Sequence, residues 1–182
     1  KKAITLKPDY IEAHNNLGVA LAEKGNLREA IASYQQVISL KPDYAEAYNN
    51  MGVALKDQDK LEEAIQAFAR ALAIKPDFAD AHYNMGNALK ELGNLEEAIQ
   101  AFAKALAIKP NYAEAYYSMG NALKELGKFE EAIEAFAKTL AIRPDDAEAC
   151  INMGVALKDQ DKLEEAIQSY AKALAIKPDY AE

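Results

Sequence analysis

The chain has a single cysteine and no surplus of positive charge, and both absences narrow what it can be. Cys150 has no second cysteine among the 182 residues, so a disulfide within the chain is impossible. A lone cysteine leaves the redox compartment open but favours a reducing one, and we expect a cytoplasmic location. The 21 basic and 29 acidic side chains give a net charge of -8. This argues against nucleic acid and membrane as main partners, because nucleic acids and anionic membranes attract basic surfaces.

The sequence also has no long apolar run and no motif of catalytic chemistry. A membrane-spanning helix needs about 20 consecutive apolar residues, and no segment approaches that length. No nucleophile elbow, phosphate-binding loop or zinc-ligand spacing occurs. We therefore expect a protein that is not an enzyme, with no catalytic residues, no metal and no cofactor.

What the sequence does have is an internal repeat. A proline recurs every 34 residues, at Pro8, Pro42, Pro76, Pro110, Pro144 and Pro178, and the residues between the prolines recur in register. A unit of this size cannot bury its apolar face alone and must stack on neighbouring units. The many Ala, Leu, Glu and Lys residues favour helix throughout. The chain is therefore predicted to be an all-α solenoid.

Residues 43–76 represent the repeated unit. Asp43 and Glu46 predict a capping box at the start of a first helix, and the sister pairs are Asp9/Glu12, Asp77/Asp80, Asn111/Glu114 and Asp145/Glu148. Tyr48, Met51 and Leu55 follow at helical spacing and form one apolar stripe. A left-handed turn is predicted to end this helix in each unit, at Gly25, Asp59, Gly93, Gly127 and Asp161.

A second helix with an apolar face of Leu61, Ile65, Phe68 and Leu72 ends before Pro76, so each unit is predicted to be a helical hairpin. A glycine lies in the middle of every first helix, although each costs about 1 kcal/mol relative to alanine. These glycines are Gly18, Gly52, Gly86, Gly120 and Gly154. Their regularity predicts close contact between the two helices, opposite Ala30, Ala64, Ala98, Ala132 and Ala166.

The repeated residues resemble the tetratricopeptide repeat family. Each unit has a Leu-Gly or Met-Gly pair, an alanine that opens the second helix, an aromatic residue four positions later and a closing proline. The aromatic residues are Tyr34, Phe68, Phe102, Phe136 and Tyr170. The resemblance implies a right-handed superhelix of stacked helix-turn-helix repeats, divided as 1–10 (part of a preceding second helix), 11–44, 45–78, 79–112, 113–146, 147–180 and 181–182 (the start of a further repeat).

The face of each first helix opposite its apolar stripe is expected to stay open, and the resemblance implies that it lines a concave groove for partner peptides. Its most regular feature is the amide row of Asn16, Asn50, Asn84, Ser118 and Asn152. A carboxamide can pair with both the N–H and the C=O of an extended peptide. The amide row is similar to the asparagine ladder of protein O-GlcNAc transferases, with Ser118 as an interruption. In the alternative interpretation, the amides only cap or bridge neighbouring first helices.

Two further sets lie on the same face. A row of lysines, Lys56, Lys90, Lys124 and Lys158, could attract an acidic partner. An acid follows each of them, and this favours a solvated surface of mixed charge. The second set, the specificity candidates, differs between repeats. A binding surface would show such variation, and neutral drift at exposed positions would show it too. The candidates are Asn15, Asn49, Tyr83, Asn87, Tyr117 and Asn121. Tyr83 and Tyr117 are hot-spot candidates by residue type.

His14, His82 and Cys150 occupy the core position that tyrosine fills in the other repeats. The two histidines lie two repeats apart, about 20 Å if each helix layer adds 8–10 Å, and so they cannot share one metal ion. All three are predicted to be packing residues, and Cys150 is predicted to be unreactive.

Three functions fit these observations. The first is a protein-interaction scaffold that binds an extended partner segment in the groove. The second is a substrate-recruiting part of a larger enzyme such as an O-GlcNAc transferase-like glycosyltransferase. The third is head-to-tail self-association, in which one end of a copy contacts the opposite end of the next copy. Ala3, Ile4 and Leu6 are expected to be exposed at one of these ends. Residues 51–66 and 153–168 are identical (MGVALKDQDKLEEAIQ), which indicates duplication of a three-repeat block.

Overall fold

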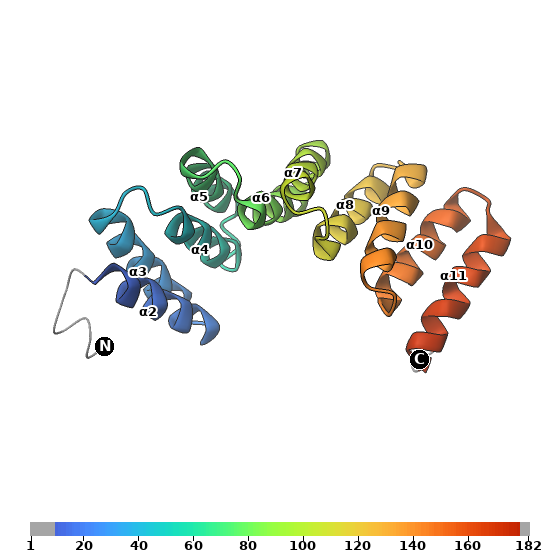
Figure 1. The fold of residues 1–182 in the computed structure, drawn as a ribbon, viewed down its shortest axis with the longest axis horizontal. Coiled ribbons are helices and arrows are strands. Elements are labelled where there is room, and N and C mark those ends of the chain that lie inside the picture. Colours follow the sequence, from blue (N-terminus) through green and yellow to red (C-terminus); the bar gives the residue numbers. More distant parts are fainter. Residues whose placement is uncertain (1–9, 179–182) are drawn as a thin grey trace. The chain divides into compact units, whose positions relative to one another are not determined.

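A computed structural model describes residues 10–178. The described residues form α-helices joined by short turns, which confirms the predicted all-α class (Figure 1). The helices are α2 (Ile11–Glu23), α3 (Leu27–Leu40), α4 (Ala45–Lys56), α5 (Leu61–Ile74), α6 (Ala79–Glu91), α7 (Leu95–Ile108), α8 (Ala113–Glu125), α9 (Phe129–Ile142), α10 (Ala147–Asp159) and α11 (Leu163–Ile176). Even-numbered helices are the first helices of the predicted repeats and odd-numbered ones the second helices. Ala3, Ile4, Leu6 and Asp9 lie outside the described residues, as do the predicted segment 181–182 and all of the predicted segment 1–10 except Tyr10.

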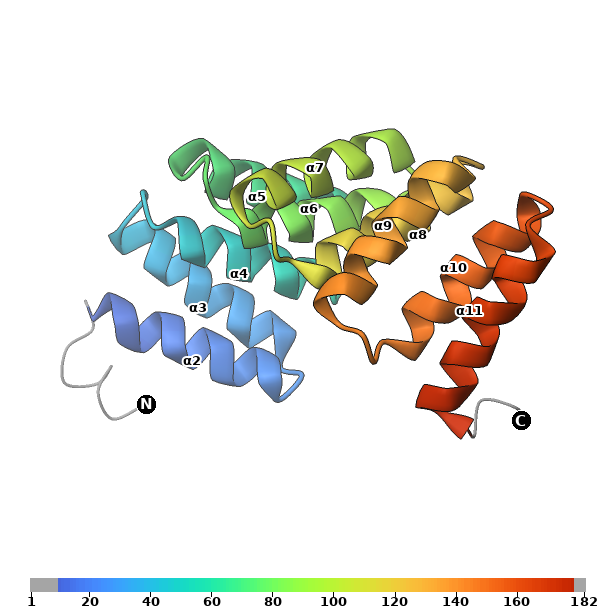
Figure 2. The same cartoon turned by 45° about the vertical axis from the view of Figure 1, so that its right-hand side comes forward.

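The chain divides into two compact units, residues 1–92 and 93–182. The N-terminal unit contains α2 to α6 and the C-terminal unit α7 to α11. Within each unit a second helix packs against its own first helix and against the first helix that follows, as for α5 between α4 and α6. Figures 1 and 2 show these stacked pairs in two views. The repeat boundaries themselves stay a prediction.

An aromatic ring of each second helix forms the centre of the core. In the N-terminal unit Phe68 is fully buried and packs with Leu55 of its own first helix and with Met85 and Ala88 of α6. In the C-terminal unit Phe136 packs in the same way with Leu123, Met153 and Ala156. Burying one such side chain contributes about 1.5–3 kcal/mol, so the stacking of one repeat on the next is the main source of stability.

The first helices begin one residue later than predicted. Tyr44, Phe78 and Tyr112 are the N-cap residues and make no side-chain cap hydrogen bond, so the capping boxes expected at Asp43, Asp77 and Asn111 are wrong. Each of these rings instead lies under the lysine that follows the preceding helix. The Nζ of Lys109, for example, is 3.9 Å from the centre of the Tyr112 ring. A ring at this position stabilises the helix start by cation–π and apolar contact rather than by a cap.

The fifth repeat supports this explanation because it lacks the ring. Asp146 occupies the aromatic position there, and its Oδ1 accepts a hydrogen bond of 2.9 Å from the backbone N–H of Ala149. The true cap is therefore Asp146 and not the predicted Asp145. Arg143, which follows the preceding helix, pairs with Glu114, as Lys75 pairs with the corresponding Glu46.

The turns after the first helices follow the prediction. Gly25, Gly93 and Gly127 have φ of 76°, 81° and 72°, and Asp59 and Asp161 have φ of 61° and 62°. This left-handed region suits glycine and is tolerated by aspartate. The same short turn therefore joins the two helices whether glycine or aspartate occupies it.

The glycines inside the first helices lie close to the second helix, and the nearest atoms belong to its aromatic ring. A Cβ at Gly52 would lie 2.6 Å from Phe68 Cε1, and a Cβ at Gly120 would lie 2.7 Å from Phe136 Cε1. The ring of the second helix therefore requires glycine, since a side chain would overlap it.

Among the described helices, none is both long enough and apolar enough to cross a bilayer.

Candidate functional site

The amide row lies along the first helices with graded exposure. Asn16 is exposed, Asn50, Asn84 and Asn152 are partly exposed, and Ser118 is buried with 7% of its surface accessible. Four of the five positions thus have an amide that solvent reaches, and the fifth has a buried hydroxyl.

In the N-terminal unit the amides link consecutive first helices. Asn50 Nδ2 donates to Asn15 Oδ1 at 3.5 Å, and Asn84 Nδ2 donates to Asn49 Oδ1 at 3.0 Å. Asn49 in turn donates to Asn50 Oδ1 at 3.4 Å. The amides therefore bridge neighbouring first helices, as in the alternative interpretation of the amide row. Two of the three hydrogen bonds are long and weak, however.

Asn49 does not lie on an open face, contrary to expectation. Only 7% of its surface is accessible. Asn84 of the next first helix covers it and supplies its hydrogen bond. Its burial needs that bond, because an unpaired buried amide costs about 1–3 kcal/mol.

The C-terminal unit uses different chemistry at the same positions. Asn152 Nδ2 donates to Tyr117 Oη at 2.9 Å, and Lys124 Nζ donates to Asn152 Oδ1 at 2.6 Å. Tyr117 Oη donates to Glu148 Oε2 at 3.4 Å. Burial raises the pKa of Tyr117, a hydrogen bond with Asn121 lowers it, and the charge of Glu148 raises it further. Asn152 is thus held more firmly than Asn50.

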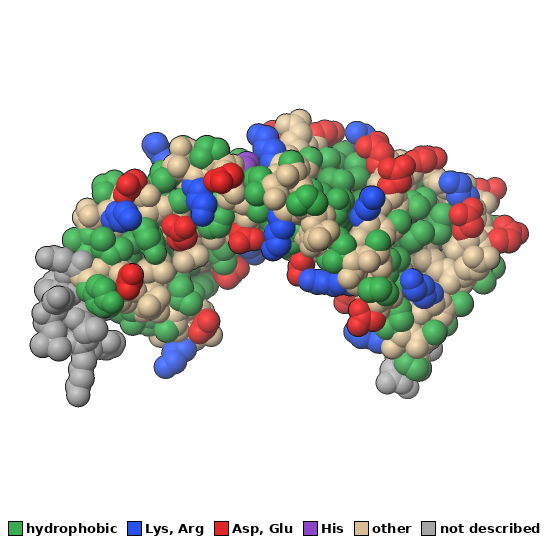
Figure 3. Space-filling view, viewed as in Figure 1, with side chains coloured by type: hydrophobic (Ala, Val, Ile, Leu, Met, Phe, Trp, Pro, Cys, Tyr) green, Lys and Arg blue, Asp and Glu red, His purple; other side chains and the backbone are tan. Residues whose placement is uncertain are grey.

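The lysine row has no uniform environment. Lys56 Nζ lies 3.2 Å from Asp57 Oδ1 and 3.6 Å from Glu91 Oε1, whereas Lys124 contacts a neutral amide. Lys90 is partly exposed and Lys158 exposed. Figure 3 shows acidic and basic side chains interspersed over the surface in view. Local neutralisation of this kind gives little long-range attraction for a charged partner.

The remaining specificity candidates, Tyr83, Asn87 and Asn121, are partly exposed on first helices. They are placed where a partner lying along these helices would contact them.

The histidine and cysteine positions are packing sites in the structure. His82 is 9% exposed, and its Nε2 lies 3.0 Å from the carbonyl oxygen of Pro76. His14 is partly exposed. Cys150 is fully buried; burial raises the pKa of its thiol, the charge of Lys172 lowers it and that of Asp146 raises it. Residues 10–178 contain no group of three or more His, Cys, Asp or Glu side chains suited to a metal ion.

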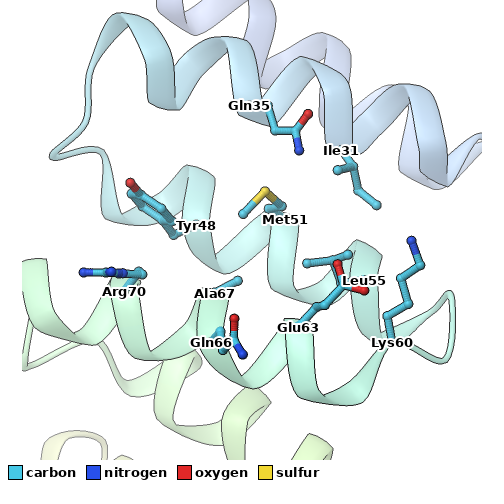
Figure 4. A pocket seen from close by; sticks show the side chains of 10 residues that line it. All are labelled: Ile31, Gln35, Tyr48, Met51, Leu55, Lys60, Glu63, Gln66, Ala67 and Arg70. Carbon is cyan, nitrogen blue, oxygen red and sulfur yellow. The ribbon is translucent and has the colours of Figure 1, made fainter.

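Sequence reasoning missed a furrow between consecutive second helices. In the N-terminal unit it holds about 360 Å³ between α3 and α5, with α4 as its floor. Figure 4 shows Met51 and Leu55 of α4 between Ile31 on α3 and Glu63 and Arg70 on α5. The repeat period could have revealed it, because a smaller furrow of about 240 Å³ in the C-terminal unit is lined by Ile99, Met119, Leu123, Glu131 and Lys138 at the corresponding positions.

The furrow is a by-product of the core rather than a built site. Leu55, Met51 and Ile31 belong to the same cluster as the buried Phe68 ring. The rim mixes Glu63 with Arg70 in one furrow and Glu131 with Lys138 in the other. Neither furrow therefore selects a ligand by charge.

Comparison with known families accounts for this architecture. Models of the TPR repeat match residues 20–59, 54–93 and 86–127. Models of the tetratricopeptide repeat match residues 1–32, 113–146 and 147–180. The chain belongs to the tetratricopeptide repeat family. Membership in this family implies a protein-interaction scaffold.

Solved structures of similar fold include several tetratricopeptide repeat proteins. A crystal structure of MamA is 27% identical with a TM-score of 0.85, covering 94% of this chain and 96% of its own. YrrB, described as a TPR protein with an unusual peptide-binding site, is 27% identical with a TM-score of 0.82, covering 98% and 92%. MamA from Desulfovibrio magneticus RS-1 is 21% identical with a TM-score of 0.86, covering 94% and 97%, and shows the fold alone. Curated protein sequences gave no significant match.

Proposed function

We propose that this tetratricopeptide repeat protein is a non-enzymatic scaffold that binds an extended segment of a partner protein along its first helices. The observation that carries the proposal is the state of Asn16 and Asn50. One is exposed, and the other is partly exposed and held only by bonds of 3.4 and 3.5 Å. A peptide backbone can replace such long bonds at little cost.

The regular spacing of these amides supports an extended ligand. Asn16 and Asn50 occupy the same position in successive repeats, so each presents the same donor and acceptor to a chain that passes both. Contacts to the backbone give affinity with little dependence on sequence, and the variable residues beside them supply discrimination. The peptide-binding site described for YrrB is consistent with this use of the fold.

The test uses a random peptide library displayed on phage and panned against the 182-residue chain. The selected peptide is then labelled, and its affinity is measured by fluorescence anisotropy for the wild type and for N16A/N50A. Each lost hydrogen bond contributes about 0.5–1.5 kcal/mol, so we expect binding to weaken by about tenfold. Thermal melting should change little, because Asn16 is exposed and Asn50 accepts only a long bond of 3.4 Å from the buried Asn49, which keeps its shorter bond with Asn84.

The matched control is N26A/N111A, which removes two exposed amides outside the first helices. It should bind the peptide as the wild type does. Equal affinity of N16A/N50A and wild type would contradict the proposal. N84A is not a clean test, because Asn84 also holds the buried Asn49 and its loss should lower stability.

The same amide row supports a second candidate, a substrate-recruiting part of a larger enzyme such as a glycosyltransferase that modifies proteins. None of the three structures described above is a transferase by its description. Reading the coding sequence on both sides of these 182 residues decides it: a catalytic domain in the same frame supports this candidate, and its absence removes it.

A further inference from the structure

The amide nitrogens of the amide row are bound in the same way in both units. In three residues of the row, Nδ2 donates to the residue 35 positions earlier, on the preceding first helix. The pairs are Asn50 with Asn15 at 3.5 Å, Asn84 with Asn49 at 3.0 Å and Asn152 with Tyr117 at 2.9 Å. These amides therefore differ mainly in what reaches their oxygen, Oδ1.

The amide oxygens of the N-terminal unit are open to a ligand. Asn50 Oδ1 accepts only the 3.4 Å bond from Asn49, which is long enough for a ligand N–H to replace it. Within residues 10–178 no described donor reaches Asn84 Oδ1, and Asn84 is partly exposed. Both α4 and α6 thus keep an acceptor for the backbone N–H of a bound segment.

The amide oxygen of Asn152 in the C-terminal unit is closed. Lys124 Nζ donates to it at 2.6 Å. A hydrogen bond from a charged donor is about twice as strong as one from a neutral N–H, so a peptide N–H cannot displace this lysine without loss. Asn152 is partly exposed, so its oxygen is closed by its partner and not by burial. The other position of the row in this unit is Ser118, which has no amide and is buried.

The counterpart lysine in the N-terminal unit has different partners. Lys56 precedes Asn84 by 28 residues, as Lys124 precedes Asn152. Its Nζ lies 3.2 Å from Asp57 Oδ1 and 3.6 Å from Glu91 Oε1 on the next first helix. These two acids hold the lysine, and Asn84 Oδ1 therefore stays open.

The lengths of the acids explain the difference between the two units. Where the N-terminal unit has Asp57 and Glu91, the C-terminal unit has Glu125 and Asp159. The acid on the next first helix is thus one methylene shorter in the C-terminal unit. In the part of the chain that the structure describes, Lys124 forms no ion pair with either acid. It donates to the neutral amide instead.

We infer that Glu91 and Asp159 decide, each through the lysine of the preceding first helix, whether the amide of their own helix can bind a partner. The partner segment then hydrogen-bonds to Asn50 and Asn84, while Asn152 stays with Lys124. The inference rests on the proposed function and assigns the backbone contacts of the segment to the N-terminal unit. Glu91 and Asp159 are positioning residues, since neither needs to touch the segment.

The first test exchanges the lengths of the acids in the N-terminal unit. D57E/E91D gives this unit the acids of the C-terminal unit, and Lys56 should then donate to Asn84. The affinity of the selected peptide, measured by fluorescence anisotropy, should fall about fivefold, which is the effect of one lost hydrogen bond. The control D77E/E97D changes two exposed acids outside the first helices and should bind as the wild type does.

The second test observes each asparagine by its side-chain amide signals in nitrogen-15 NMR, assigned from the signals lost in N50A, N84A and N152A. In the wild type the peptide should shift the signals of Asn50 and Asn84 and leave those of Asn152 in place. E125D/D159E gives the C-terminal unit the acids of the N-terminal unit. In this variant the peptide should also shift Asn152, because contacts to a peptide backbone depend little on its sequence. A merely structural role of the acids would not move this signal.

The peptide used is one whose affinity N16A/N50A lowers. If the library yields no such peptide, the proposed function fails and this inference fails with it. If such a peptide exists, three results would each overturn the inference and leave the proposed function standing. They are an unchanged affinity of D57E/E91D, a shift of Asn152 in the wild type, and no shift of Asn152 in E125D/D159E.

Discussion

The pKa of Tyr117 depends on contacts within the candidate site. It receives a hydrogen bond from Asn152 and donates one to Glu148. Burial raises the pKa of its phenol above the ordinary value of about 10, and the charge of Glu148 acts in the same direction. The folded chain thus favours neutral Tyr117. Its contribution to stability is complete below pH 10 and is lost as the pH rises through the raised pKa.

We therefore predict that Tyr117 ionises at higher pH in the folded chain than a free tyrosine does. The difference in absorbance near the tyrosinate band between wild type and Y117F isolates this one side chain during a pH titration. In E148Q the same difference should move to lower pH, because the neighbouring negative charge is gone. A Y117F difference spectrum centred at the value of a free tyrosine would refute the prediction.

Within the first helices, two interior glycines lie equally close to an aromatic ring, but one ring is buried and the other is partly exposed. A Cβ at Gly52 would lie 2.6 Å from Phe68 Cε1, and a Cβ at Gly154 would lie 2.6 Å from Tyr170 Cε1. Phe68 is fully buried, whereas Tyr170 is partly exposed and has room to turn aside. The overlap is the same, but only one ring can yield.

G52A should lower the stability of the chain, and G154A should leave it nearly unchanged. Alanine gains about 1 kcal/mol in helix propensity, while overpacking in a closed core costs about 1–3 kcal/mol. Urea unfolding followed by circular dichroism measures both variants. In the G52A/F68L pair the penalty of G52A should shrink, since leucine removes the ring atoms that it meets. An equal loss in both glycine variants would mean that the state of the ring does not matter.

The helices and turns of this chain were predictable because their signals are local. Asp59 and Asp161 stand where other repeats have glycine, and their left-handed backbone follows from that alignment alone. The helix starts were not predictable in the same way. Asp43 has the residue type of a cap, yet the ring of Tyr44 beneath Lys41 begins the helix.

Side-chain partners across helices were the least predictable part of the site. The period of 34 residues places Asn84 one position after Tyr83, the counterpart of Asn49 in the next repeat, but it does not show that Asn84 covers Asn49. That outcome depends on how far consecutive first helices are shifted along each other. The face of a helix can be read from spacing, whereas the depth of a residue within a stack requires the packed structure.

For the molecule as a whole, repeat stacking makes stability depend on neighbours rather than on helix sequence. The helices α5 and α11 differ only at Ala67/Ser169, Phe68/Tyr170 and Arg70/Lys172. Their intrinsic helix propensities are therefore close. The helix α5 packs between α4 and α6, but α11 has only α10 against it among the described helices of its unit. Local opening should therefore be easier in α11.

We predict that backbone amides of α11 exchange with deuterium at least about tenfold faster than those of α5, which corresponds to about 1.4 kcal/mol of opening free energy. Native-state hydrogen exchange on dilute protein gives both values in one sample. The variant S169A/Y170F/K172R makes α11 identical in sequence to α5. Because the missing neighbour is the cause, the difference should persist in this variant; equal exchange of the two helices would assign it to the three residues instead.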